Sequence, residues 1–351
     1  DRQSSGPVDR LSTEGLEEFL TIFALELGSS TNAEKLKTLF HEAYLKHTNL
    51  ADATRYLANA LFGDYGLVIL DADDANLKRQ FIPFIKEEVL KQTAFSKVNE
   101  TIEQFGNYTV QVNPREINLF FIEDNLRERI IFEDGGYKIN NTKIHFSEQE
   151  LLAELELHPE KFSPNVVMRP LYQEVILPNL AYIGGGGEIA YWLELKSFFD
   201  AVKVTFPMLI VRNSVVLATE KQLKKADALA LNWSDLFQKQ TLLINNKTKQ
   251  LSEFDIDLSD LKQQLQQQFQ ALNELTYKTD RSFAGAVKAQ EVKQTKGLEQ
   301  LEKRLLKAQK RKLADSLSRI TALQNELFPN QSLQERQANF SEFYLENGEQ
   351  L

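Results

Sequence analysis

Apolar and polar residues alternate along this 351-residue chain with two different periods, which together predict a mixed α/β protein. Over residues 14–28 and 33–61, apolar residues recur every three or four positions, as on the buried face of a helix. From about 108 to 146 the period shortens to two, and the pairs Gly135-Gly136 and Asn140-Asn141 separate the stretches. This second pattern is typical of antiparallel strands joined by hairpin turns.

Three short apolar runs predict buried strands with helices between them: Gly66–Leu70, Val166–Met168 and Phe206–Val211. A helical pattern follows the first run from about Leu77 to Leu90, and another covers Leu171 to Leu177. Since strands and helices alternate, we expect a parallel sheet with crossover helices. Between the hairpins and this region, Ser147 and Glu150 have the spacing of a capping box, which predicts a short helix.

Four consecutive glycines, Gly184, Gly185, Gly186 and Gly187, lie between a short apolar strand and an amphipathic helix. Without a Cβ the chain can turn with positive φ and admit a ligand close to its backbone. The first amides of the following helix lack intrahelical acceptors and favour an anion. The run lacks the Lys-Ser/Thr of a P-loop and the Gly-x-Gly-x-x-Gly pattern, so a plain flexible turn is the alternative.

Arginines and aspartates stand where these expected strands end. Arg169 and Arg212 each follow an apolar run, and the planar fork of a guanidinium suits a carboxylate or phosphate. The alternative is an ion pair with Glu174 or Glu188. Asp71 and Asp73 follow the first run and are candidates to meet a ligand hydroxyl or amine. The alternative for this segment is that Asp73 or Asp74 caps the next helix.

Beyond about residue 250 the composition shifts to Gln, Lys, Leu and Glu, with leucines at three-four spacing over 258–272 and 298–327. Such spacing predicts a coiled coil, and Thr279–Ser282 between the runs predicts a turn that makes a helical hairpin. A helix of about 30 residues projects roughly 45 Å, which favours a partner subunit. The basic cluster over 303–312 is either an anion site or the solvated face of the coil.

Composition narrows the classes of function. The net charge of −9 argues against general nucleic-acid binding, and no apolar run approaches the length of a membrane span. No signal-peptide pattern opens the chain, so we expect a cytoplasmic protein. There is no cysteine, which excludes thiol nucleophiles and thiolate metal sites, and the four histidines lack ligand spacing, so no metal is expected.

Several motifs resemble one known family, and they occur in the same order along nearly the whole chain. They are Arg169–Glu174, Leu177–Trp192, Phe206–Ser214, Asp280–Phe283, Phe328–Asn330 and Leu333–Arg336. These stretches resemble the bacillithiol biosynthesis cysteine-adding enzymes, a family of cysteine ligases. The resemblance implies an α/β fold with a Rossmann-like, nucleotidyltransferase-like parallel core, connecting insertions and a C-terminal α-helical coiled coil that dimerises. Members of that family carry a further amino-terminal portion, which the resemblance leads us to expect beyond this chain.

The resemblance also implies a cytosolic ligase that joins L-cysteine to glucosaminyl-malate, in the last step to bacillithiol, as a homodimer. ATP or ADP is the expected energy source. The alternative is a non-catalytic dimeric scaffold that binds a metabolite. A third possibility, a relative of synthetases that modify nucleic acids, is disfavoured by the net negative charge.

The sequence predicts six segments and a set of site residues. The segments are a helical connecting segment at 1–62, core parts at 63–100 and 161–250, a small antiparallel insertion at 101–160, a coiled coil at 251–328 and a tail at 329–351 that docks on the core. Substrate binding is expected from Arg169, Gln173, Gly184, Gly185, Gly186, Gly187, Tyr191, Arg212 and Asn213. Proton transfer is expected from Glu174 or Glu188, and nucleotide binding from Asp71 and Asp73.

Overall fold

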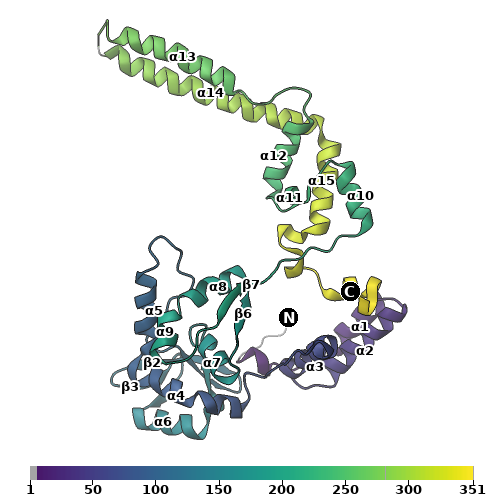
Figure 1. The fold of residues 1–351 in the computed structure, drawn as a ribbon, viewed down its shortest axis with the longest axis vertical. Coiled ribbons are helices and arrows are strands. Elements are labelled where there is room, and N and C mark those ends of the chain that lie inside the picture. The colour runs from purple at the N-terminus through teal and green to yellow at the C-terminus, as the bar shows by residue number, and fades with distance from the viewer. Residues whose placement is uncertain (1–5, 281, 351) are drawn as a thin grey trace. The chain divides into compact units, whose positions relative to one another are not determined.

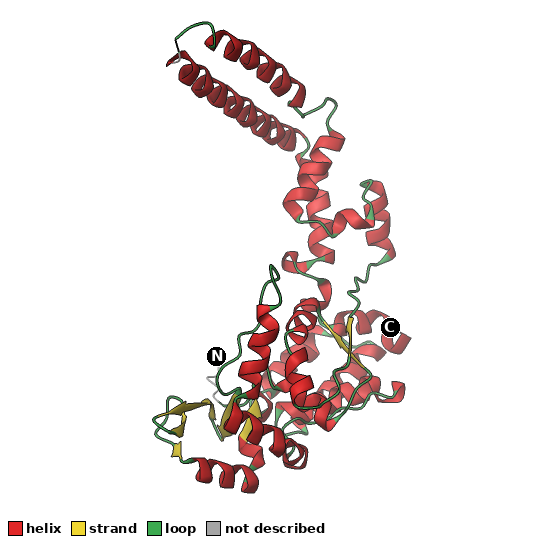
Figure 2. Cartoon of the chain, turned by 60° about the vertical axis from the view of Figure 1, so that its left-hand side comes forward, coloured by secondary structure: helices red, strands yellow, loops and turns green. Residues whose placement is uncertain are grey.

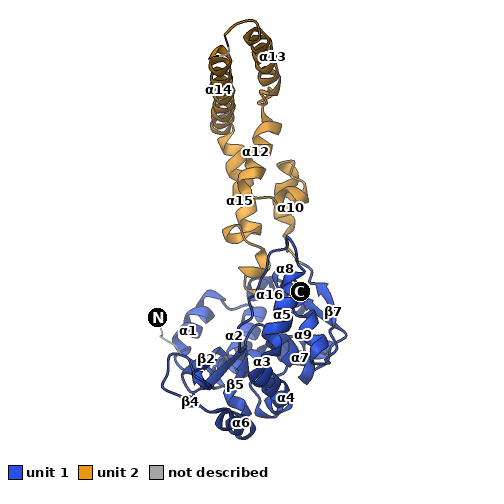
Figure 3. Cartoon of the chain, turned by 90° about the vertical axis from the view of Figure 1, so that its left-hand side faces the viewer, with its two compact units in different colours: residues 1–213, 340–351 blue, residues 214–339 orange. Residues whose placement is uncertain are grey.

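The computed structural model describes residues 6–280 and 282–350. It contains two compact units, Asp1–Asn213 with Phe340–Leu351, and Ser214–Asn339, and Figure 3 colours them separately.

The first unit opens with three helices, which confirms the helical pattern in the sequence. They are α1 (Glu17–Glu26), α2 (Thr31–Leu45) and α3 (Leu50–Phe62). The side chain of Ser30 caps α2 and that of Asn49 caps α3. The C-terminal helix α16 (Phe340–Asn347) packs on α2, where the rings of Phe40 and Phe340 stack with centroids 6.0 Å apart.

The expected strand at Gly66–Leu70 is wrong. These residues follow the 3₁₀ turn η2 (Gly63–Tyr65) without regular structure, and Val68 is 67% exposed. The run is apolar, but no strand pairs with it in the described part of the chain, so it does not become part of a sheet. Asp74 caps the next helix, α4 (Ala75–Lys91), as one of the alternatives predicted. Helix α5 (Thr93–Glu103) follows directly.

The antiparallel strands predicted from about 108 to 146 are confirmed. Its five strands lie in the order β4-β3-β2-β1-β5, visible as yellow arrows in Figure 2. The strands are β1 (Leu119–Glu123), β2 (Leu126–Glu133), β3 (Gly136–Ile139), β4 (His145–Phe146) and β5 (Phe162–Pro164). Both glycine and asparagine pairs lie at turns, and Ser147 and Glu150 form the predicted capping box of α6 (Glu148–Leu157). The 3₁₀ turn η3 (Pro159–Lys161) leads from α6 into β5.

The parallel part of the fold consists of β6 (Ala181–Gly184) and β7 (Met208–Val211), joined through α8 (Gly186–Leu193) and α9 (Lys196–Ala201). The predicted strand, helix and strand around the glycines are therefore confirmed. The pair leaves apolar side chains in contact with solvent: Ile183 is 64% exposed and Met208 67%.

The expected strand at Val166–Met168 is wrong, because these residues form a turn. The side-chain oxygen of Asn165 accepts hydrogen bonds from the backbone N–H groups of Val167 and Met168 at 2.8 and 3.2 Å. This local bonding turns the chain into α7 (Arg169–Ile176). Arg169 therefore begins a helix, whereas the sequence predicted that it ends a strand.

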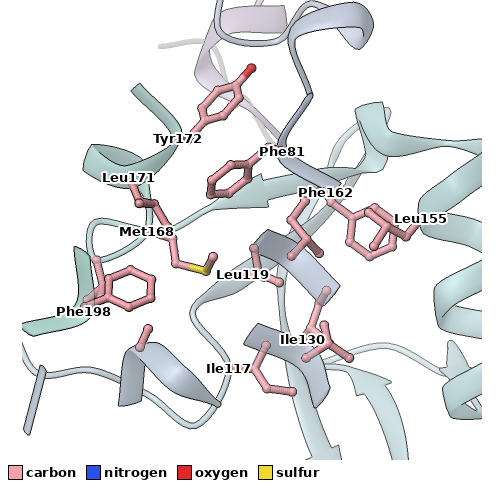
Figure 4. Packing of buried hydrophobic residues seen from close by; sticks show 14 of the residues in the cluster. Phe81, Ile117, Leu119, Ile130, Leu155, Phe162, Met168, Leu171, Tyr172 and Phe198 are labelled. Carbon is pink, nitrogen blue, oxygen red and sulfur yellow. The ribbon is translucent and has the colours of Figure 1, made fainter. Parts of the chain in front are cut away.

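One hydrophobic core holds the sheet, α4, α7 and α9 together. Met168 and Leu171 enter it from the start of α7, and Figure 4 shows them between Phe198, Phe81 and Leu119. All five side chains are 1% exposed or less. Burial of side chains of this size stabilises a fold by about 1.5–3 kcal/mol each, so the first turn of α7, which carries Arg169, is firmly held.

The second unit is helical. Its helices are α10 (Glu220–Ala228), α11 (Trp233–Leu236), α12 (Gln240–Leu251), α13 (Ser259–Thr276), α14 (Ser282–Lys312) and α15 (Ala314–Leu327). Helices α13 and α14 lie side by side as the predicted hairpin (Figure 1). Arg281, in the predicted turn, lies outside the described residues. Ile320 and Leu327 pack with residues of α10, α11 and α12, so the last part of the expected coil belongs to a small core instead.

Candidate functional site

The glycine turn and Arg212 lie at the same edge of the parallel pair. In the register of β6 and β7, Gly184 faces Val211. The backbone N–H of Arg212 then donates to the carbonyl of Gly184 at 2.9 Å. The carboxyl ends of both strands therefore meet at the N-terminus of α8, the arrangement in which α/β proteins hold ligands.

Space requires a glycine at Gly184, and none of the four glycines is needed for positive φ, so that part of the prediction is wrong. None of the four has a positive φ, and Gly185 has φ −67°. A Cβ on Gly184 would lie 2.7 Å from Cε1 of Tyr182 and 3.2 Å from Cβ of Glu188. Gly186 and Gly187 have open space around the Cβ position. A ligand can therefore approach the backbone of the first turn of α8 closely.

A carboxylate already lies at this helix N-terminus. Glu188, in the first turn of α8, accepts a hydrogen bond from the backbone N–H of Gly185 at 2.7 Å. Its side chain is exposed. The N-terminus of a helix stabilises negative charge, and Glu188 shows that this one can bind a carboxylate.

Arg169 lies in a cluster of neutral oxygens. Its guanidinium donates to Oε1 of Gln173 at 3.3 Å and to the hydroxyl of Tyr191. Tyr182 also lies close enough to contribute to the raised pKa of Arg169. Gln173 lies one turn further along α7, Tyr182 lies on β6 and Tyr191 lies on α8, so three elements converge on the guanidinium.

The alternative expectation, an ion pair of Arg169 with Glu174 or Glu188, is not what the structure shows. In the described ranges the hydrogen-bond partners of this half-buried guanidinium are the amide oxygen of Gln173 and the phenol oxygen of Tyr191. Burial acts to lower the pKa of Arg169, but the oxygens of Tyr191 and Tyr182 outweigh it and the pKa is raised. Burial raises the pKa of Tyr191, although Arg169 acts against this shift. At neutral pH the site is therefore a cation surrounded by neutral groups.

Tyr182 is a site residue that the sequence analysis missed. Its ring stacks on Trp192 with centroids 4.1 Å apart, and it contributes to the raised pKa of Arg169. Trp192 is fully buried, so the ring of Tyr182 is held rigidly. The sequence feature that could have revealed Tyr182 is its position two residues before Gly184, on the strand that leads into the glycine turn.

Glu174 and Glu188 have different surroundings. Glu174 is 3% exposed. Its carboxylate accepts hydrogen bonds from the backbone N–H and side-chain amide of Asn179 at 2.9 and 3.0 Å, and from Nε2 of Gln173 at 3.2 Å. Of the two glutamates, Glu188 is therefore the one that solvent and a ligand can reach.

Asp71 and Asp73 belong to a different cluster, so their expected place at a strand end is wrong. Asp73 forms ion pairs with Arg10 at 2.6 Å and with the buried Lys78. Lys78 also donates to the backbone carbonyl of Glu160 at 2.8 Å. Asp71 accepts a hydrogen bond from the backbone N–H of Asp73 at 2.9 Å. These contacts fasten η1 (Val8–Arg10) and η3 to the start of α4.

The remaining expectations concern Asn213, metals and membranes. Asn213 is exposed directly after Arg212. Within residues 6–280 and 282–350, no three His, Asp or Glu side chains gather as a metal site requires. Of the helices in these ranges, none is both long enough and apolar enough to cross a bilayer.

The fold and the candidate site define a class: a Rossmann-like α/β protein with a glycine turn between a parallel strand and a helix, with a half-buried arginine that contacts this helix, and with a helical hairpin in a second unit. Comparison with family models identifies the family. Residues 1–213 match the model described as the N-terminal Rossmann-like domain of bacillithiol biosynthesis BshC, and residues 215–351 match its C-terminal coiled-coil domain. The chain belongs to the BshC family.

Full-length relatives agree with this assignment. A protein of Flavobacterium johnsoniae is 72% identical over 350 residues, which cover 100% of this chain and 66% of the relative. Proteins of Flavobacterium psychrophilum and Christiangramia forsetii are 63% and 56% identical, over 99% and 100% of this chain and 66% of each relative. All three are named "Putative cysteine ligase BshC". The chain thus spans about two thirds of the length of the curated relatives it matches.

Proposed function

We propose that this chain is part of a cytoplasmic ligase that joins the carboxyl group of L-cysteine to the amine of glucosaminyl-malate, the last step of bacillithiol biosynthesis. Membership of the BshC family and the names of the relatives support the reaction class. The structure supports one part of the proposal, which is the binding of an acidic substrate near Arg169.

The half-buried guanidinium of Arg169 carries the proposal. A cation withdrawn from water costs free energy unless negative charge compensates it. Gln173, Tyr182 and Tyr191 supply oxygen atoms but no negative charge. A carboxylate of the substrate supplies both oxygen atoms and negative charge. The malate part of glucosaminyl-malate has two carboxylates, and the planar fork of arginine binds such a group through two parallel hydrogen bonds.

The activated intermediate needs a second anion site, which we assign to the start of α8. Amide formation from a carboxylic acid requires activation, and we propose ATP or ADP as the co-reactant. The backbone N–H groups of Gly186 and Gly187 and the side chain of Arg212 are the groups that would hold its phosphates. The turn has no Lys-Ser/Thr pair, so backbone and arginine would do this without a P-loop lysine.

The chemical step follows from these assignments. The amine nitrogen of glucosaminyl-malate attacks the activated carboxyl carbon of cysteine, and the new C–N bond forms. The phosphate-bearing group leaves with the electrons of the broken C–O bond. The proton of the amine passes to a carboxylate, and we propose Glu188, because it is exposed at the turn.

We also propose a homodimer formed through α13 and α14. A groove of about 560 Å³ runs between these helices, lined by Leu261, Leu265, Leu298, Leu301 and polar residues between them. Leu261 is 48% exposed and Leu301 55%, although both occupy positions of the leucine pattern. A second copy of the hairpin would bury these side chains as a coiled coil does.

The ligase proposal is tested by incubating the full-length protein with L-cysteine, glucosaminyl-malate and ATP or ADP and detecting the amide product by mass spectrometry. We expect Arg169→Ala to reduce the rate at limiting glucosaminyl-malate, and Arg212→Ala the rate at limiting ATP or ADP, each by about 10- to 100-fold, the equivalent of one charge-assisted hydrogen-bonded contact. Arg79→Ala on the exposed face of α4 is the matched control. Full turnover in both site variants would refute the assignment.

A further inference from the structure

A continuous chain of hydrogen bonds connects the loop before β6 to the Arg169 guanidinium. Asn179 donates to Glu174 through its backbone N–H at 2.9 Å and its side chain at 3.0 Å. On the other side, Nε2 of Gln173 donates to Oε1 of Glu174 at 3.2 Å. Oε1 of Gln173 then accepts from Arg169 at 3.3 Å, and Arg169 donates to Tyr191. The chain is thus Asn179, Glu174, Gln173, Arg169 and Tyr191.

The direction of these bonds is set by Glu174. An ionised carboxylate only accepts hydrogen bonds, so each neighbour that bonds to it must donate. Gln173 therefore has to turn its NH₂ group toward Glu174, which leaves its carbonyl oxygen facing Arg169. If the amide flipped, its NH₂ would face the N–H groups of the guanidinium, and two donors would oppose each other. Glu174 in this way fixes Gln173 as an acceptor for Arg169.

Burial makes this arrangement rigid. Glu174 is 3% exposed, and its neighbour Tyr172 is packed in the main core. Arg169 and Gln173 are one helical turn apart on α7, so their side chains lie on the same face. The Asn179 side chain also donates to the carbonyl of Leu177 at 2.8 Å while it contacts Glu174. The carboxylate therefore has donors on both sides and little freedom to rotate.

We propose that Glu174 is a positioning residue: through Gln173 it holds the Arg169 guanidinium in the orientation that receives a carboxylate of the acidic substrate. The inference rests on the proposed function, since it takes Arg169 as the group that binds glucosaminyl-malate. It gives Glu174 a role in substrate binding and leaves proton transfer to Glu188.

The test is a double-mutant cycle in the full-length protein. Glu174→Gln replaces a pure acceptor by a group that can also donate, so the Gln173 amide is free to flip. We expect the KM for glucosaminyl-malate to rise about tenfold, while kcat changes less than twofold and the KM for L-cysteine is unchanged. In an Arg169→Ala background Glu174→Gln should raise the KM for glucosaminyl-malate no further, because there is no guanidinium left for Glu174 to orient.

The matched control is Glu88→Gln. Glu88 is 1% exposed and accepts hydrogen bonds from the backbone and side chain of Asn118 and from the backbone of Ala94, much as Glu174 does with Asn179. It lies on α4, and its hydrogen-bond partners Asn118 and Ala94 belong to neither α7 nor α8. Glu88→Gln should lower the thermal midpoint of unfolding as Glu174→Gln does. It should leave the KM for glucosaminyl-malate and the KM for L-cysteine unchanged.

If Glu174→Gln does not fold, Gln173→Leu removes the connection while it preserves the contact of Glu174 with Asn179, and the same rise in KM is expected. Additive effects of the Glu174 and Arg169 substitutions, or an unchanged KM in Glu174→Gln and Gln173→Leu, would overturn the positioning role and leave the proposed function intact. An unchanged KM in Arg169→Ala alone would instead refute the proposed substrate site, and the positioning role with it.

Discussion

The carboxylate of Glu188 lies 2.7 Å from the backbone nitrogen of Gly185, from which it accepts a hydrogen bond. The first turn of α8 therefore binds an acid of its own chain in this structure. An acidic ligand that approaches the same turn competes with Glu188 for this N–H group, and the negative charge of Glu188 opposes it.

Replacement of Glu188 should separate binding from chemistry. In Glu188→Ala we expect inorganic phosphate to bind about two- to fivefold more tightly, because a like charge worth about 0.5–1 kcal/mol has been removed from the helix N-terminus. Turnover should fall by about 10²- to 10⁴-fold, the usual contribution of a general base. Calorimetry with phosphate and an initial-rate assay measure the two effects.

The control for this prediction is Glu150→Ala. Glu150 bonds the backbone N–H of Ser147 at 2.8 Å at the start of α6, in the same capping position. It should cost similar stability without loss of turnover. Weaker phosphate binding, or unchanged turnover, in Glu188→Ala would contradict the role of Glu188.

The two ends of the glycine run should respond differently to a methyl group. Gly184→Ala places a Cβ 2.7 Å from the ring of Tyr182, so we expect a loss of about 1–3 kcal/mol in the free energy of unfolding as the ring shifts. Gly187→Ala adds a methyl group in open space inside a helix, where alanine is favoured over glycine by about 0.5–1 kcal/mol. Urea unfolding curves measure both, and equal effects would contradict the steric account.

The cluster around Asp73 should control stability in acid. Burial acts to raise the pKa of Asp73, but Arg10 and Lys78 outweigh it and the pKa is lowered. In the unfolded chain this carboxyl has a pKa of about 3.9. Below about pH 5 the unfolded chain therefore binds more protons than the folded chain. The stabilisation that the ionised Asp73 gives is lost as the pH falls toward the folded pKa. We expect Asp73→Ala to cost about 3 kcal/mol at pH 7, because Lys78 stays buried without its carboxylate.

Urea unfolding of the wild type and of Asp73→Ala at several pH values from 7 to 3 measures this difference. The gap between the two should narrow as the pH falls. Asp64→Ala, at an exposed aspartate before α4, is the control and should run parallel to the wild type. A gap that stays constant down to pH 3 would show that the charge of Asp73 does not stabilise the fold.

The proposed dimer depends on the exposed leucines of the hairpin. Leu261→Lys combined with Leu301→Lys puts two charges into the groove between α13 and α14, and we expect the protein to become monomeric at micromolar concentration. Light scattering after size-exclusion chromatography gives the mass. Gln266→Lys, at an exposed polar position of α13, should leave the mass unchanged. A monomeric wild type would contradict the dimer.

The sequence predicted those parts of the fold that local pattern controls. The glycine run separates β6 from α8 because glycines interrupt the apolar pattern on both sides, and Ser147 with Glu150 marks the start of α6. The hairpin of α13 and α14 follows from the spacing of its leucines. In each case neighbours within a few residues supply the physical cause.

The sequence predictions were wrong where a side chain from outside the segment, or an unexpected side-chain contact, determines the local structure. Val166–Met168 has the composition of a strand, but the side chain of Asn165 binds the backbone there and starts α7. The neutral partners of Arg169 come from β6 and α8 as well as its own helix, and no local spacing reveals that Tyr182 is one of them. The residue types of the candidate site came from the sequence, but the geometry of that site depends on tertiary packing.

The central claim is that Arg169 binds a carboxylate of glucosaminyl-malate. Calorimetric titration of the full-length protein with this compound, for the wild type and for Arg169→Ala, tests it most directly. We predict that the dissociation constant rises by at least about tenfold in the variant, as expected for the loss of a charge-assisted contact, while the thermal midpoint stays within a few degrees. Equal dissociation constants in two folded proteins would contradict the claim.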